Sequence, residues 1–138
     1  MRLAGWNERL TAFALAALGR RFCWGETDCA LLGFEAFDAM TGGHLAVAYR
    51  GRYDSLHKAL RFQRRWWIDA AHVLRESGCV EVKDIERGDI VVVPRDGFAC
   101  CHVAFGARVL AAWCGTPVGW GSTAEALAAP GASILRVP

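Results

Sequence analysis

The stretch RFCWGETDCALLGFEAF, residues 21–37, decides how the rest of the chain is interpreted. In it, the Trp24-Gly25 pair is typical of a turn, and Asp28 stands directly before an apolar segment that contains Cys29. Asp is a preferred residue at a helix N-cap, because its carboxylate accepts hydrogen bonds from the first free backbone N–H groups. We therefore predict a helix that begins after Asp28 and carries Cys29 in its first turn.

Helical periodicity lies on both sides of this stretch, in the first half of the chain. Apolar spacing predicts a helix over residues 6–19, and Gly42-Gly43 should end the helix that follows Asp28. Further helices are predicted from near Asp54 to residue 65 and over residues 68–78.

From Gly88 onward the pattern changes to short β-branched or aromatic runs separated by turn residues, which is typical of strands. The predicted strands lie within residues 88–97, 98–106, 107–115 and 132–138, and CGTPVG at 114–119 is predicted to be a turn. Helices followed by an antiparallel sheet indicate the α+β class. We expect one domain over residues 1–138, helical to about residue 79 and sheet-forming from about residue 80.

Length and charge limit the functions to consider. A chain of 138 residues suits one domain, and 16 basic against 14 acidic side chains give only +2, so any electrostatic partner surface must be local. No apolar run reaches the roughly 18–20 residues of a membrane-spanning helix. The segment LTAFALAALG, residues 10–19, is interpreted as part of the first helix rather than a secretory signal, because Glu8 and Arg9 precede it and Arg20-Arg21 follow it.

A thiol at a helix start has a chemical consequence. Free N–H groups and the positive end of the helix dipole favour the thiolate, so we expect a lowered pKa for Cys29. His102 is the only histidine in the sheet half, and strand alternation places it with Ala104 on the face opposite Cys101. A Cys and a His that are distant in sequence but adjacent in space would act together as a nucleophile and its general base.

The combined motifs resemble a known family. Phe22-x-Trp24-Gly25, Asp28-Cys29 opening a helix, Gly88-Asp89-Ile90-Val91 opening a strand and His102-Val103-x-Phe105-Gly106 look like the NlpC-type papain-like cysteine peptidases of the cell wall. The order and rough spacing of the motifs cover residues 22–112. Thr41-Gly42 and Arg50-Gly51-Arg52-Tyr53 resemble more closely the small members encoded in the tail modules of long-tailed bacteriophages and gene-transfer particles.

The resemblance implies roles for individual residues. Cys29 takes the place of the nucleophile and His102 that of the base, while Trp24, Gly25 and Asp28 support the substrate pocket. The sequence also departs from the family pattern, with no polar orienting residue near Ala111, Phe22 where the family has Tyr, Ala30-Leu31 in place of Ser-Gly after the cysteine, and a short Glu26-Thr27 insert.

Two functions of different classes follow from this resemblance. The first is a phage tail-tip or baseplate protein that cleaves a peptide or amide bond of peptidoglycan during cell-wall penetration. The second is a catalytically reduced structural tail-tip component that acts as an assembly or adaptor part. A free cytoplasmic thiol hydrolase is a further alternative. For both tail-tip functions we expect the virion tail tip as the location, after synthesis in the bacterial cytoplasm.

The segment RGRYDSLHKALRFQRR, residues 50–65, carries six basic side chains against Asp54. It is either a solvated basic face or a surface for an anionic partner, and its spacing does not separate the two. The adjacent aromatic pair that follows suggests a protein interface. The candidate partner-binding residues are Arg61, Arg64, Arg65, Trp66 and Trp67. We expect other tail-tip proteins as partners, namely a hub, distal tail or adaptor protein, and we do not expect nucleic acid.

The six cysteines do not form a metal-binding pattern. Structural zinc sites usually present Cys-x₂₋₄-Cys pairs, whereas the adjacent Cys100 and Cys101 should point to opposite faces of a strand. Burial of Cys29 as a simple core thiol remains an alternative to the nucleophile role. We expect no metal and no cofactor.

Overall fold

A computed structural model of the chain describes residues 1–66 and 69–138. Within these residues the helices that precede the first strand are α1 Trp6–Ala17, α2 Cys29–Thr41, α3 Leu45–Tyr49, α4 Leu56–Trp66 and α5 Ala70–Glu76. The rest of the chain forms β1 Val80–Val82, β2 Ile90–Arg95, β3 Phe98–Phe105, β4 Arg108–Trp113, β5 Thr116–Ser122, α6 Thr123–Ala128 and β6 Ser133–Arg136. The predicted α+β class is confirmed.

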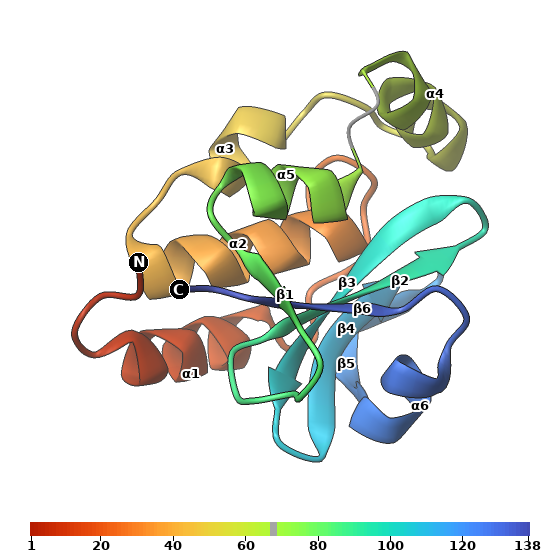
Figure 1. Ribbon diagram of the computed structural model, residues 1–138. Helices are drawn as coiled ribbons and strands as arrows, with labels where there is room; N and C mark the ends of the chain where they lie inside the picture. Colours follow the sequence, from red (N-terminus) through yellow and green to blue (C-terminus); the bar gives the residue numbers. More distant parts are fainter. Residues whose placement is uncertain (67–68) are drawn as a thin grey trace.

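The strands form one antiparallel sheet with the order β1-β6-β2-β3-β4-β5. Helices α1, α2, α3 and α5 lie on one side of the sheet, and α6 lies on the other side against β2, β4 and β5 (Figure 1). Helix α4 lies apart from the other helices, near the β2–β3 turn (Figure 1). Gln63 on α4 donates a hydrogen bond to the carbonyl of Gly97 in that turn at 2.9 Å.

Helix α2 is the centre of the core. It packs mainly on β3, and a Cβ added at Gly33 would lie 2.5 Å from the Cβ of Cys101. The glycine therefore allows the helix and the strand to approach closely. A second, smaller apolar cluster on the α6 side contains Val91, Val93, Val109 and Ala126.

The Gly88-Asp89 pair directly before β2 has a structural role. The carboxylate of Asp89 is fully buried and accepts from the Arg136 guanidinium at 2.8 and 3.0 Å and from the Glu86 backbone N–H at 2.7 Å. The guanidinium of Arg2 lies 3.6 Å away. Loss of one partner of a buried ion pair leaves an uncompensated buried charge and is strongly destabilising. The contacts of Arg2 and Arg136 with Asp89 therefore fix both chain ends to the sheet.

Four elements differ from the sequence-based prediction, and one of them is β1, a strand of three residues outside the predicted strand ranges. The CGTPVG segment is not only a turn, because β5 begins at Thr116 and pairs with β4 along Arg108↔Ser122 to Trp113↔Thr116. Helices α3 and α6 were not predicted, and both are short, with five and six residues. Short helices carry little periodicity, so the sequence offered only weak signals for them.

Candidate functional site

Cys29 is the first residue of α2, as predicted, and Asp28 is its N-cap. The Asp28 carboxylate accepts hydrogen bonds from the backbone N–H groups of Ala30 at 3.0 Å and Leu31 at 2.9 Å. Its other oxygen accepts from the N–H of Gly25 at 2.9 Å. Asp28 is fully buried and therefore holds the helix start and the preceding turn in one arrangement.

The Arg50-Gly51-Arg52-Tyr53 segment packs directly on this turn. The Gly51 N–H donates to the Gly25 carbonyl at 2.8 Å, and the hydrogen bond of the Tyr53 hydroxyl to Asp28 lowers the pKa of that carboxyl. Burial is the larger effect, however, and raises the pKa of Asp28 above its ordinary value. The sequence marked this segment only as a subgroup motif, and the structure shows that it supports Asp28.

An ion-pair cluster fixes the same segment from the other side. Glu35, on α2, accepts from Arg20 at 2.7 Å and from Arg50 through a short contact. The Glu35 side chain is only 15% exposed, so these contacts are shielded better than an ordinary surface pair. The segment before the Trp24-Gly25 turn, through Arg20, and residues 50–53, through Arg50, are thus both linked to α2.

The Cys29 thiol lies in an apolar and sulfur-rich environment. Its side chain is fully buried, and its Sγ lies 3.1 Å from Cys100 Sγ on β3. The first turn of α2 lies next to β3 in the ribbon (Figure 1). Burial raises the pKa of Cys29 well above its usual range, and Cys100, Asp28 and Cys101 act in the same direction. The expected lowering of this pKa by the helix start is therefore wrong, because desolvation of the thiolate outweighs the helix dipole.

His102 lies on β3 opposite Val91, on the side of the sheet that faces α6. It lines a hollow of about 440 Å³ whose other polar lining residues are Arg95, Ser122 and Glu125. Burial lowers the pKa of His102, and its buried Nδ1 has no hydrogen-bond partner. Across residues 1–66 and 69–138, no hydrogen bond or ion pair joins His102 to Cys29. The structure thus pairs Cys29 with Cys100.

The position expected for the residue that orients His102 is also apolar. Ala111 lines the same hollow as His102, which agrees with its predicted place on the strand after the histidine. A methyl group accepts no hydrogen bond, so it cannot hold an imidazole tautomer as a carboxylate or amide would.

Trp24 belongs to an aromatic cluster at the end of the sheet. Its ring centroid lies 4.8 Å from Phe22, 5.4 Å from Phe98 and 6.0 Å from Trp113. Trp113 also lines a second hollow beside His102, of about 280 Å³. The cluster therefore connects the Cys29 turn with the His102 side through packed rings.

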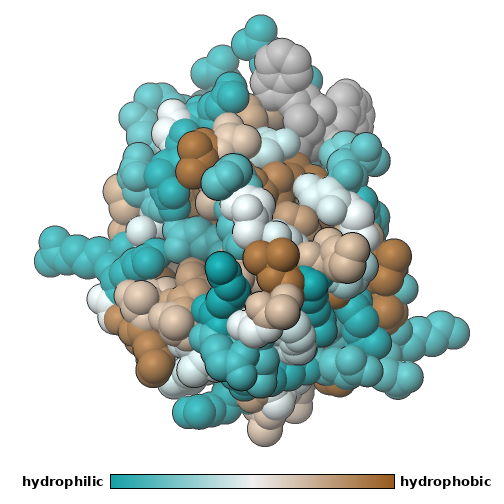
Figure 2. Space-filling model, turned by 90° about the vertical axis from the view of Figure 1, so that its left-hand side faces the viewer, coloured by the Kyte–Doolittle hydropathy of each residue, from teal (hydrophilic) through white to brown (hydrophobic). Residues whose placement is uncertain are grey.

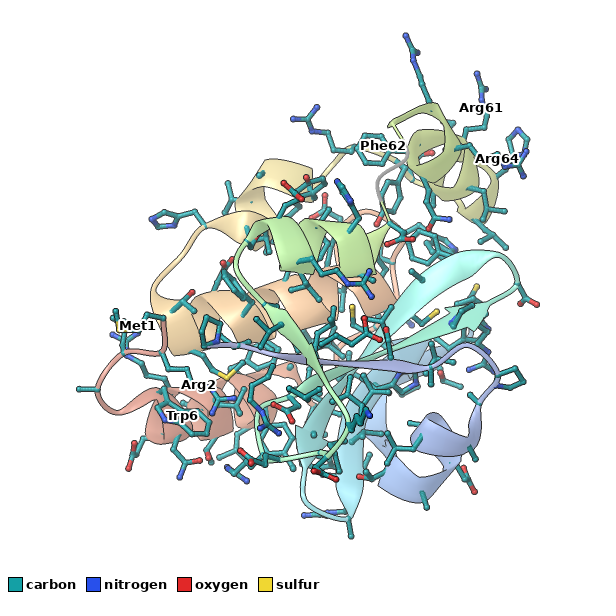
Figure 3. The ribbon with its side chains drawn as sticks, in the orientation of Figure 1. Met1, Arg2, Trp6, Arg61, Phe62 and Arg64 are labelled. Atoms are coloured by element: carbon teal, nitrogen blue, oxygen red, sulfur yellow. The ribbon has the colours of Figure 1, made fainter. Side chains whose placement is uncertain are left out.

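The predicted partner surface occupies the outer side of α4. Arg52, Lys58, Arg61, Phe62, Arg64 and Arg65 line an open hollow of about 550 Å³, which we call the basic hollow. Arg61 and Arg64 point away from the body of the protein (Figure 3). Phe62 instead contacts the rings of Tyr49 and Tyr53, 6.3 and 6.0 Å away. Trp67 and the side chain of Trp66 lie outside the described residues.

The face seen in Figure 2 offers a contrast. Apolar side chains there occur singly or in small groups among hydrophilic ones. It shows no broad apolar surface of the kind that marks many stable interfaces.

In the described part of the chain, no three His, Cys, Asp or Glu side chains are grouped so that they could hold a metal ion. No helix among these residues is both long enough and apolar enough to span a membrane.

Comparison with known proteins defines the class to which the chain belongs. A family described as "Domain of unknown function (DUF6950)" matches residues 1–129, which include both the Cys29 turn and the His102 strand. The chain belongs to this family. Searches of the curated proteins and of the solved structures found no match.

Proposed function

We propose that this protein is a component of the tail tip or baseplate of a long-tailed bacteriophage or related particle, built on an NlpC-like, papain-type scaffold. The proposal rests on the resemblance of the Trp24-Gly25, Asp28-Cys29 and Arg50-Gly51-Arg52-Tyr53 motifs. The α+β architecture, with Cys29 at the start of the central helix, supports it. The protein would be made in the bacterial cytoplasm and incorporated into the virion tail tip.

Within that location, the geometry favours an assembly role over hydrolysis. The main support for the assembly role is the environment of Cys29. Its side chain is fully buried, and its sulfur lies 3.1 Å from the Cys100 sulfur. A nucleophile needs access to substrate and a thiolate fraction at working pH, and burial opposes both. Hydrogen bonds to Asp28, from the backbone at Gly25, Ala30 and Leu31 and from the Tyr53 side chain, hold the helix start and the preceding turn together without any catalytic role.

The basic hollow is the proposed docking surface for a neighbouring tail protein. Arginines outnumber lysines in it, and the planar guanidinium forms bidentate contacts with carboxylates. We therefore expect an acidic surface or segment on the partner, a hub, distal tail or adaptor protein. Charge complementarity of this kind sets the rate and orientation of assembly more than its affinity.

A thiol peptidase or amidase is the second candidate. It is favoured by the place of Cys29 at the start of α2, where the Asp28 cap takes up the N–H groups of Ala30 and Leu31 but not that of Cys29. Under this hypothesis the Cys29 sulfur attacks a peptidoglycan carbonyl, and a backbone N–H near Cys29 stabilises the oxyanion. His102 takes the proton of the thiol and transfers it to the leaving amine. The site would first have to open, so that Cys29 leaves Cys100 and meets His102. A free cytoplasmic hydrolase would use the same residues without the particle.

A peptidoglycan digestion experiment separates these functions. Wild-type protein, Cys29→Ala, His102→Ala and the control Cys79→Ala are incubated with purified peptidoglycan, and released fragments are identified by mass spectrometry. The assembly role predicts identical profiles without new fragments, and detection of the chain in purified particles that also assemble with Cys29→Ala. Fragments that need both Cys29 and His102 would establish the hydrolase instead. Absence of the chain from particles would contradict the tail-tip location.

A further inference from the structure

Two buried cysteines from distant parts of the chain meet in the core. Cys29 begins α2 and Cys100 lies on β3, 71 residues later, yet their sulfurs are 3.1 Å apart. Cys29 is fully buried and Cys100 is 1% exposed. A disulfide bond is about 2.05 Å long, so closing this gap needs a sulfur movement of only about 1 Å.

We propose that Cys29 and Cys100 form an oxidation site that reacts with peroxide to give an intramolecular disulfide. One thiolate attacks a peroxide oxygen, the O–O bond breaks, and a sulfenic acid and water result. The second sulfur then attacks the sulfenic sulfur, the S–O bond breaks, and a second water leaves as the S–S bond forms. Two thiols and one hydrogen peroxide molecule thus give one disulfide and two water molecules.

The other cysteines do not offer an equivalent pair. Cys23 and Cys114 are exposed and Cys79 is buried, and no sulfur contact joins any of the three to another cysteine among the described residues. Cys101 follows Cys100 directly, but its side chain is directed toward Gly33, where it would meet an added Cβ at 2.5 Å. The strand thus presents one sulfur to Cys29 and the next to the middle of α2. The geometry therefore selects Cys100 as the partner of Cys29.

The disulfide would change both stability and chemistry. It would join the first turn of α2 to β3 and constrain the unfolded chain across a long loop, which stabilises the folded state. It would also remove the free thiol of Cys29. The inference goes beyond the proposed function and does not depend on it, because the same bond would strengthen an assembly part or inactivate a hydrolase.

Access and ionisation set the expected rate. Hydrogen peroxide is small enough to reach a buried thiol during local opening. Since burial raises the pKa of Cys29, the thiolate fraction at neutral pH is low and oxidation should be slow. The rate should increase as the pH is raised through 8 to 10.

The test uses the full-length chain with Cys23→Ser and Cys114→Ser, which removes the exposed thiols. The reduced protein is treated with hydrogen peroxide, denatured in an alkylating reagent, and analysed by intact mass and peptide mapping. We expect two fewer alkylated thiols, a mass lower by two hydrogens before alkylation, and one cross-linked peptide containing Cys29 and Cys100. The oxidised protein should melt at a higher temperature, and a reducing agent should reverse both changes.

Two further variants test the assignment. Adding Cys100→Ser should abolish the cross-link, whereas adding Cys101→Ser should leave it intact. If Cys100→Ser does not fold, the peptide map of the protein that retains Cys100 still decides the question. The proposal is overturned if the cross-link joins another pair, if Cys29 proceeds to sulfinic acid without a disulfide, or if all four buried thiols stay reduced.

Discussion

The backbone carbonyl oxygen of Tyr53 occupies the space that a side chain at residue 25 would fill. A Cβ built on Gly25 would lie 1.8 Å from that oxygen, and Gly25 has a positive φ of 80°. Two sequence motifs that lie 28 residues apart, at Gly25 and Tyr53, are therefore in direct contact. The contact explains why a glycine follows Trp24 and why the Tyr53 segment belongs to the candidate site.

Replacing this glycine tests the contact. Gly25→Ala should lower the free energy of unfolding by more than about 3 kcal/mol, because the Cβ penalty of the left-handed conformation is combined with a clash against backbone. The matched control is Gly106→Ala, which has the same φ of 80° but nothing within 4 Å of the added Cβ. It should cost only about 1–2 kcal/mol. Denaturant unfolding of both variants provides the comparison, and equal losses would contradict the contact.

The buried Asp28 carboxylate should make the cost of Asp28→Asn depend on pH. An amide keeps one acceptor oxygen but presents a donor to one of the N–H groups, so we expect a loss of about 1–3 kcal/mol. Because the folded pKa of Asp28 is raised above its ordinary value of 3.8, the folded state binds the proton more tightly than the unfolded state. Wild-type stability from this group then falls as the pH rises from about 4 through the folded pKa.

Asp28→Asn does not titrate, so the difference between the two proteins should be larger at pH 4 than at pH 7. Urea titrations at both pH values measure it, with Asp54→Asn as the control because Asp54 is exposed. A penalty that grows toward pH 7 would mean that the carboxylate form is favoured in the folded state, contrary to the burial argument.

Thiol labelling should distinguish exposed from buried cysteines. In the native protein at pH 7.5, an alkylating reagent should modify Cys23 and Cys114 rapidly, because both are exposed. Cys29 and Cys101 should react far more slowly, since burial raises the pKa of each thiol. Peptide mass spectrometry over a time course measures the rates. Rapid labelling of Cys29 would show an accessible thiolate and would favour the hydrolase.

Local signals account for what the sequence predicted correctly. Helix α2 is specified by residues within it and directly at its two ends, where Asp28 is the N-cap and Gly42 the C-cap. Strand β5 lacks such signals, because Pro117, Gly119 and Gly121 are turn residues by local preference. Their extended conformation depends on pairing with β4, and pairing between strands cannot be obtained from the composition of one segment.

The candidate site was predictable in its components but not in its contacts. Alternation correctly placed Cys101 and His102 on opposite faces of β3, whereas Cys100 and Cys101, which alternation also separates, both contact α2. It could not show that Cys29 would meet Cys100, because that depends on where the first turn of α2 lies along the strand. The raised pKa of Cys29 was missed for the same reason, since desolvation depends on side chains distant in sequence.

Charge reversal on α4 tests the basic hollow as a docking surface. Arg61→Glu combined with Arg64→Glu should weaken binding of a poly-glutamate peptide, used as a probe for an acidic partner surface, by roughly tenfold or more, because each surface ion pair contributes up to about 1 kcal/mol. Arg9→Glu combined with Arg21→Glu changes the net charge equally at exposed positions away from the hollow and should have a much smaller effect. Fluorescence anisotropy at several salt concentrations measures both. Binding to wild type should decline as salt screens the charges. Equal weakening by the two double variants would show a response to net charge alone and would remove the basic hollow as a specific surface.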